Sequence, residues 1–227
     1  THVTPIPGET LRSYPVLDYV LIGEPDLTIR DLLDHLEDKV EQRPPAIAKM
    51  FDKHDPLYRP AIDPNGRVEM HGIKGVGWRE GEQIVINPSR PFLRDLDDMP
   101  QPLHHLLPLD AYRMPMIHGP FTFIVSSRGC PAGCTFCIKH VSYQFTTRLR
   151  SPEHIMEELW LLKKLGMNNI HMYADLFTVS RDQVMGLCRM MIDEKINIRW
   201  TCNSRVDYVD EEMLQMMARA GNWLISW

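Results

Sequence analysis

Three cysteines lie close together in the sequence, as Cys130, Cys134 and Cys137. Glycines and a proline separate them, so one tight loop can direct all three thiolates to a common point. The chain has 5 cysteines, an odd number. This crowding favours metal ligation in a reducing compartment over a disulfide framework. The sequence therefore predicts a metal site on these three residues and a cytoplasmic protein.

The number of ligands narrows the kind of metal site. Structural zinc takes four protein ligands, and most iron–sulfur clusters take four cysteines. The other two cysteines, Cys188 and Cys202, fall on a predicted helix face and in a predicted strand, as core residues do. Three ligands on a four-iron cluster would leave one iron open to a substrate. Two alternatives stay open: a zinc site completed by His140, and an electron-transfer cluster completed by a remote cysteine. Lys139 and Tyr143 follow the loop and could face either a substrate or solvent.

A regular alternation of strands and helices surrounds the cysteines. Apolar strand-like runs lie at 121–126, 169–174, 198–202 and 223–227. Between them, helices are predicted to start at the N-caps Ser151, Ser180 and Asp210, with a capping box from Ser180 to Gln183. Such alternation predicts parallel βαβ units with right-handed crossovers. The fold class is α/β, with residues 120–227 forming the first half of a (β/α) barrel. Active sites of such barrels lie where the strands end.

The part of the chain before the barrel has a different pattern. A strand is predicted at 17–22, and a helix after Pro25 with one apolar face made by Ile29, Leu32, Leu33 and Leu36. We interpret residues 1–43 as the tail of an α/β domain. Residues 44–119 are rich in proline, and we interpret them as a linker with local β structure. Within it, residues 73–78 and 83–87 are predicted to pair as a hairpin. In the same linker, a structural role is expected for His104 and His105. Because the sequence stops on a new apolar strand without its helix, we expect it to be part of a longer protein.

Composition excludes some classes of function. Hydrophobic residues make up 44% and charged residues 24% of the chain, with a net charge of −5. This balance argues against nucleic acid as a partner, and an RNA methylthiotransferase should carry a basic module that is missing here. No run of 18 apolar residues predicts a transmembrane helix.

The cysteine spacing, with Phe136 before the last cysteine, resembles the radical S-adenosylmethionine (radical SAM) superfamily. The resemblance implies a [4Fe–4S] cluster whose open iron chelates S-adenosylmethionine. One electron, from a donor such as flavodoxin or ferredoxin, then breaks a carbon–sulfur bond and leaves a 5′-deoxyadenosyl radical. By the same match Phe136 and Asn203 contact the cofactor, Asp175 holds the amino group or ribose, and Arg205 holds the carboxylate. No catalytic residue is assigned.

Two further resemblances suggest which radical enzyme this is. The stretch 17–25 with its helix is similar to the last strand and helix of a cobalamin-binding domain, which implies cobalamin. Residues 127–227 most resemble the anaerobic magnesium-protoporphyrin IX monomethyl ester oxidative cyclases, in the segments 134–141, 171–178 and 200–207. This resemblance implies a small-molecule substrate, namely a porphyrin. It also implies a reaction that closes the fifth ring in the biosynthesis of bacteriochlorophyll, a pigment of photosynthesis. Cobalamin-dependent radical SAM methyltransferases share these features and are the alternative.

Overall fold

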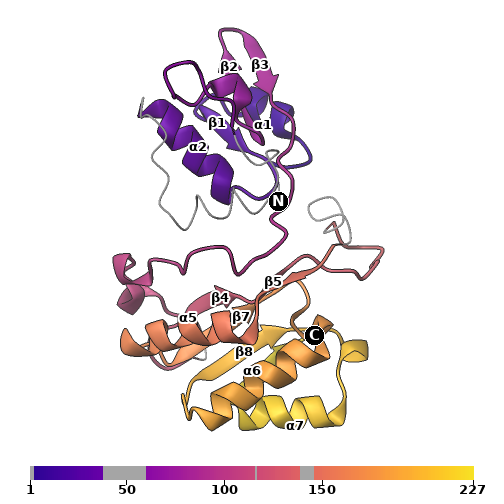
Figure 1. Ribbon diagram of the computed structural model, residues 1–227. Coiled ribbons are helices and arrows are strands. Elements are labelled where there is room, and N and C mark those ends of the chain that lie inside the picture. The colour runs from indigo at the N-terminus through magenta and orange to yellow at the C-terminus, as the bar shows by residue number, and fades with distance from the viewer. Residues whose placement is uncertain (1–2, 38–59, 116, 139–145) are drawn as a thin grey trace. The chain divides into compact units, whose positions relative to one another are not determined.

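The computed structural model describes residues 3–37, 60–115, 117–138 and 146–227 (Figure 1). It contains two compact units, Thr1–Arg94 and Asp95–Trp227. The predicted boundaries, after residues 43 and 119, do not coincide with this division. The segment interpreted as a linker is shared between the two units, because its hairpin joins the first unit and its proline-rich end joins the second.

The first unit is built on an antiparallel sheet of three strands in the order β1-β2-β3. Its elements are α1 (Pro7–Ser13), β1 (Tyr19–Leu21), α2 (Asp26–Leu36), the 3-10 turn η2 (Met70–Gly72), β2 (Val76–Glu80) and β3 (Gln83–Ile86). The predicted hairpin is confirmed, and Gly81 takes the positive φ of 62° that its tight turn requires. The predicted strand β1 is confirmed too. It pairs antiparallel with β2, with Tyr19 opposite Trp78.

Helix α2 buries a face that mixes apolar and polar residues: Leu27, Thr28, Asp31, Leu32 and Asp34. Three of the four apolar side chains predicted to be buried are about half exposed: Ile29, Leu33 and Leu36. Thr28 and Asp31 are fully buried instead. Arg90 reaches both, with its Nε donating to Thr28 Oγ1 at 3.1 Å and its Nη2 paired with the Asp31 carboxylate. Of the predicted apolar face Leu32 is buried, and the buried side is shifted toward Thr28 and Asp31 because an arginine distant in sequence satisfies these polar groups.

The second unit contains a parallel sheet in the strand order β4-β7-β8-β9. Its strands and helices are β4 (Thr122–Val125), β5 (Ser127–Arg128), β6 (Arg148–Leu149), α5 (Pro152–Lys164), β7 (Asn169–Tyr173), α6 (Arg181–Asp193), β8 (Arg199–Asn203), α7 (Glu211–Arg219) and β9 (Asn222–Ser226). Single 3-10 turns are η3 (His104–Leu106), η4 (Leu109–Ala111), η5 (Phe177–Val179) and η6 (Val206–Tyr208). The predicted alternation of strands and helices, and hence the partial barrel, is confirmed.

Local sequence explains where the helices begin. The three predicted N-caps are confirmed, each accepting a backbone N–H three residues later: Ser151, Ser180 and Asp210. The capping box was half wrong, because the Gln183 side chain does not return to the Ser180 backbone. Its Nε2 donates to the carbonyls of Ser126 (3.1 Å) and Arg150 (2.6 Å). Gln183 thereby ties α6 to the strands that flank the cysteine loop.

The two faces of the parallel sheet differ. Helices α5, α6 and α7 cover one face (Figure 1), and alternate strand residues such as Ile124, Met172 and Trp200 pack into that core. The other face presents side chains from the same strands, with Phe123 57% and Tyr173 42% exposed. In a (β/α) barrel the helix-covered face is outside, so the second face lines the interior.

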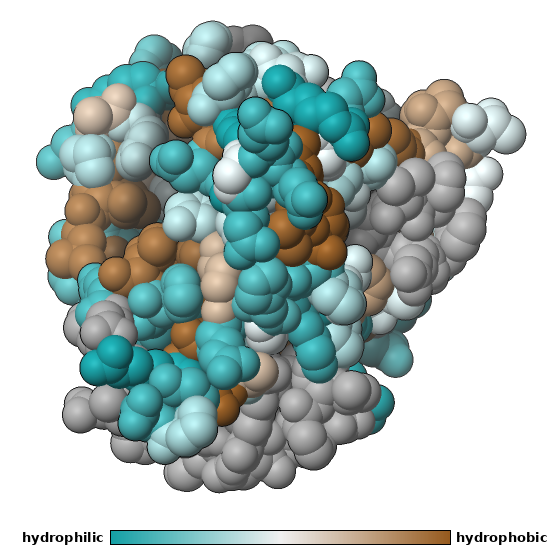
Figure 2. Space-filling model, turned by 90° about the horizontal axis from the view of Figure 1, so that it is seen from above, coloured by the Kyte–Doolittle hydropathy of each residue, from teal (hydrophilic) through white to brown (hydrophobic). Residues whose placement is uncertain are grey.

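Some large apolar side chains are exposed at the surface. Figure 2 shows one face of the molecule, where hydrophobic residues lie among a larger hydrophilic area. Across the described residues, no helix has the length and apolar character needed to cross a membrane.

Candidate functional site

The cysteine loop begins where the first strand of the parallel sheet ends. Strand β5 leads into Gly129, which has a positive φ of 88°, and β6 pairs with β5 on the return. Within the loop the Cys137 N–H donates to the Cys134 carbonyl at 3.1 Å, forming a turn between these two ligand candidates. All three cysteines are partly buried, and none of them forms a disulfide. Lys139, His140 and Tyr143 lie outside the described residues.

Asp175 holds the start of this loop. It follows β7, and its Oδ2 accepts the backbone N–H of Gly129 at 3.0 Å. The pKa of the Cys130 thiol is raised, first by burial and then by the negative charges of Asp175, Cys134 and Cys137. The loop and the neighbouring strand end therefore gather three thiols and a carboxylate, and such thiols bind a metal in their deprotonated form. The donor set fits an iron–sulfur cluster.

Arg205 approaches the loop from the end of the third strand. Its Nη1 donates to Cys134 Sγ at 2.7 Å. Its Nε donates to Asp207 Oδ1 at 2.9 Å and its Nη2 donates to Asp207 Oδ2 at 2.6 Å. The guanidinium carbon lies 5.7 Å from the centre of the Tyr208 ring. This fork holds the pKa of Asp207 below its ordinary value. Asp207 was missed in the sequence, although its spacing of two residues from Arg205 was a usable signal.

The remaining predicted cofactor residues make fewer contacts. Phe136 is 91% exposed. Asn203 ends β8 opposite Ser226, at the same end of the sheet as Arg205. Among the described residues, potential ligand side chains do not form a preassembled group of three at metal-binding distance. The structure thus brings Asp175 and Arg205 into contact with the cysteine loop.

The two other cysteines belong to the core, as predicted. Cys188 on α6 and Cys202 in β8 are fully buried. Burial raises the pKa of each thiol to about 12. At neutral pH both are therefore neutral, and both lie under the helices, on the face of the sheet opposite the barrel interior.

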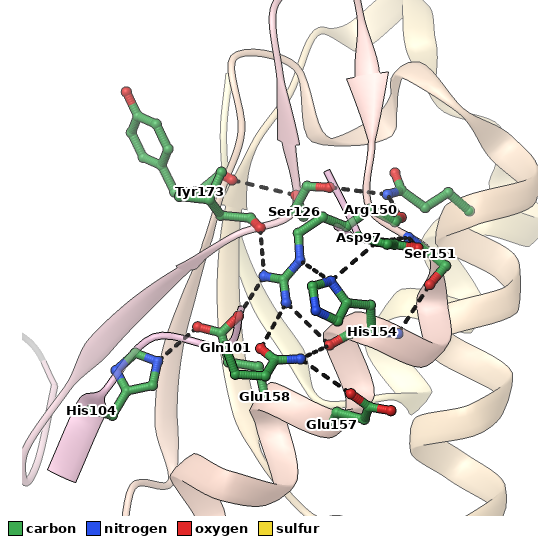
Figure 3. Close-up of polar contacts among 12 residues, drawn as sticks. Asp97, Gln101, His104, Ser126, Arg150, Ser151, His154, Glu157, Glu158 and Tyr173 are labelled. Carbon is green, nitrogen blue, oxygen red and sulfur yellow. Dashed lines mark hydrogen bonds and ion pairs between the residues drawn. The ribbon is translucent and has the colours of Figure 1, made fainter. Parts of the chain in front are cut away.

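A buried polar network joins the end of β4 to helix α5 (Figure 3). Arg150, just after β6, donates from Nη1 to the Val125 carbonyl at 2.9 Å and pairs with Glu158 of α5. Glu158 also bonds His104 Nε2 at 2.7 Å. Arg150 Nη2 reaches Gln101 Oε1 at 3.1 Å. His104 has the structural role expected of it, whereas Arg150 and Glu158 were missed because no local pattern distinguishes buried charges.

The inner face of the sheet carries a hydrogen-bonded histidine and threonine near its middle. His171 of β7 and Thr201 of β8 are joined by a 2.8 Å contact between Nδ1 and Oγ1. Burial lowers the pKa of His171, so its imidazole is neutral at pH 7. Together with Phe123 and Tyr173, whose rings lie 6.3 Å apart, it gives the middle of this face an aromatic character.

Comparisons with known proteins agree with this geometry. Residues 124–226 match the family model described as the radical SAM superfamily. An uncharacterized methyltransferase of Pyrococcus horikoshii is 30% identical over 97% of this chain and 42% of its own length. A putative methylthiotransferase of Methanocaldococcus jannaschii is 31% identical over 68% of this chain and 34% of its own length. The anaerobic magnesium-protoporphyrin IX monomethyl ester cyclase of Cereibacter sphaeroides is 27% identical, over 66% of this chain and 25% of its own length. The chain spans less than half of each of these relatives.

A solved structure has the same fold. The radical S-adenosylmethionine methyltransferase TsrM from Kitasatospora setae, with tryptophan and a SAM analogue bound, aligns with 98% of this chain and 39% of its own, with a TM-score of 0.64 and 14% identity. The cysteine loop, the parallel sheet and the family match lead to one conclusion. Residues 124–226 form a radical SAM domain.

Proposed function

We propose that this chain is part of a cobalamin-dependent radical SAM methyltransferase that acts on a small molecule. The observation that carries the proposal is the loop with three cysteines that follows β4 and β5, in contact with Asp175 and Arg205, in a radical SAM domain. Cys130, Cys134 and Cys137 would hold a [4Fe–4S] cluster. When bound, the cluster supplies one electron and an open iron for S-adenosylmethionine.

The other residues of the site would position the cofactor and exclude water. Asp175 keeps the loop in place through the Gly129 N–H, and Asn203 lies at the same strand ends. The guanidinium of Arg205 still has N–H groups that could bind the carboxylate of S-adenosylmethionine. Phe123 and Tyr173 line the inner face of the sheet, where an apolar substrate would be shielded from solvent.

The relatives favour methyl transfer over the oxidative cyclisation expected from the sequence. The relative that matches 97% of the chain is named a methyltransferase, whereas the cyclase of Cereibacter sphaeroides matches 66%. A second solved structure of TsrM, similar at a TM-score of 0.64, holds cobalamin and a [4Fe–4S] cluster. That supports cobalamin as the further cofactor here. Oxidative cyclisation of a magnesium porphyrin is the second candidate, favoured by the resemblance of three segments and by the cyclase relatives. The proposed electron donor is a flavodoxin or ferredoxin, which fits a cytoplasmic enzyme.

Cysteine variants test the cluster. In the full-length protein reconstituted without oxygen, we expect about four iron and four sulfide per chain, as a four-iron cluster implies. Cys130→Ala, Cys134→Ala and Cys137→Ala should each abolish reductive cleavage of S-adenosylmethionine. The control is Cys188→Ala, which should keep the cluster because this thiol is buried in the helix-covered core. Stoichiometric zinc without acid-labile sulfide would refute the proposal, and loss of iron in folded Cys188→Ala would refute the ligand set.

Product analysis then tests the reaction. S-adenosylmethionine labelled in its methyl group should pass label to cobalamin and then to the substrate. Turnover of magnesium-protoporphyrin IX monomethyl ester to a five-ring product without label would establish the cyclase candidate instead. A product that gains sulfur together with the methyl group would indicate methylthio transfer, the activity named for the Methanocaldococcus jannaschii relative.

A further inference from the structure

The contacts of Arg205 divide its guanidinium into two parts. The edge formed by Nε and Nη2 is occupied by the two oxygens of Asp207, at 2.9 and 2.6 Å. The remaining nitrogen, Nη1, donates to Cys134 Sγ at 2.7 Å. A planar guanidinium gripped along one edge has a fixed direction for its other nitrogen. Asp207 therefore determines where Nη1 points.

Local backbone geometry brings the two residues together. The Ser204 N–H donates to the Ser226 carbonyl at 2.9 Å, which extends the sheet pairing past the end of β8. The Tyr208 N–H then donates to the Arg205 carbonyl at 3.1 Å and closes η6. Arg205 and Asp207 thus start from adjacent, well-defined positions, although both side chains are about half exposed, at 40% and 55%.

We propose that Asp207 is a positioning residue that aims Arg205 at the sulfur of Cys134 and thereby makes the iron–sulfur cluster easier to reduce. The inference rests on the proposed function, because it requires Cys134 to be a cluster ligand. Hydrogen bonds to the sulfurs help to set the reduction potential of a cluster. A reduced cluster carries one more negative charge, so a positively charged donor stabilises the reduced state more than the oxidised one.

A simple effect of charge predicts the opposite sign. Asp207 is itself negative and close to the cysteine loop, so its removal without loss of positioning would favour the reduced cluster. If Asp207 acts by holding Arg205, its removal releases the guanidinium and favours the oxidised cluster. The direction of the change in potential therefore distinguishes the two roles.

The experiment compares midpoint potentials in the full-length protein, reconstituted without oxygen and titrated without S-adenosylmethionine. Asp207→Leu removes both acceptors at similar side-chain size, and Asp207→Glu keeps a carboxylate. The matched control is Glu212→Gln, which removes one of two exposed carboxylates that pair with Arg181. Iron and sulfide content is measured for every protein.

We expect Asp207→Leu to shift the equilibrium between reduced and oxidised cluster roughly tenfold toward the oxidised state, a fall of about 59 mV for a one-electron couple. Asp207→Glu should return the potential toward the wild-type value, and Glu212→Gln should not change it. An unchanged or higher potential in Asp207→Leu, with wild-type iron and sulfide, would overturn this inference and leave the proposed function intact. A wild-type protein without a four-iron cluster would overturn both.

Discussion

Two arginine networks in the second unit use the same chemistry in opposite surroundings. Arg150 is paired with Glu158 in the interior, where their side chains are 8% and 1% exposed. Arg205 is paired with Asp207 at the surface, where theirs are 40% and 55% exposed. Arg150 donates to several partners of the same unit, including Val125, His154 and Gln101. Arg205 has one carboxylate partner and one cysteine.

The difference in burial gives the two ion pairs different roles: the buried pair stabilises the fold, and the exposed pair is accessible to a ligand. A buried ion pair cannot be left half-formed, because the remaining charge would have no solvent to stabilise it. An exposed pair contributes little to stability, and its groups remain accessible to a ligand. The Arg150 network therefore fixes the strand ends, and the Arg205 network keeps a charged group accessible beside the cysteine loop.

The largest effect is expected for Glu158→Gln, which would leave Arg150 buried without its charged partner. Breaking a buried pair typically costs about 3–5 kcal/mol. We expect a loss of that order in the free energy of unfolding, measured by denaturant titration. Glu212→Gln removes the exposed partner of Arg181 and should leave the midpoint unchanged. Equal losses of unfolding free energy in the two variants would contradict the expected difference between the buried and the exposed ion pair.

A smaller effect, on binding and not on folding, is expected for Arg205→Lys. A lysine keeps the charge but cannot reproduce the planar fork. Losing a paired, charge-assisted contact weakens binding by roughly 10- to 150-fold. We expect S-adenosylmethionine affinity to fall by that factor, measured without oxygen in the full-length protein, with cluster content and unfolding midpoint as in the wild type. Unchanged affinity would exclude Arg205 from the cofactor site.

The pH dependence of stability provides a further test of the buried Glu158–Arg150 pair. Burial alone would raise the pKa of Glu158, but hydrogen bonds from His104 and Arg150 outweigh it and hold the pKa below its usual range. A depressed pKa stabilises the fold above the unfolded value, about 4.3, and this contribution is lost as the pH falls through the folded pKa. Below about pH 4 the wild type should lose up to about 1.4 kcal/mol per pH unit through this group. Glu158→Gln should lack that component, and a parallel decline in both proteins would contradict the assignment.

The barrel half could be predicted from the sequence because its signals are local. Caps at Ser151, Ser180 and Asp210 and apolar runs of strand length each report on a few neighbouring residues. The buried face of α2 could not be predicted, because Arg90 satisfies Thr28 and Asp31 from a distant part of the chain. The hairpin was visible in the sequence, whereas its pairing with β1 depends on tertiary contacts.

The same distinction applies to the candidate site. Cysteine spacing identified the loop, since three thiols within a few residues need little else to meet at a metal. The contacts of Arg205 with Cys134 and of Asp175 with Gly129 join different strand ends, so only their positions at the rim could be inferred. Gln183 was assigned to a local cap, and the structure uses it to bond two carbonyls outside its own helix.

The segment that precedes β4 has a consequence for how such domains could be exchanged between proteins. Asp97 accepts the Ser151 N–H with both oxygens, at 3.0 and 3.2 Å, and Gln101 Nε2 donates to the His154 carbonyl at 2.9 Å. These contacts, with His104 on Glu158, attach the segment to the start of α5 (Figure 3). A recombination event that joined a foreign sequence at Phe121 would strip Arg150 and Glu158 of these neighbours. A viable crossover point would lie before Asp95, so the inherited module is longer than its barrel strands alone.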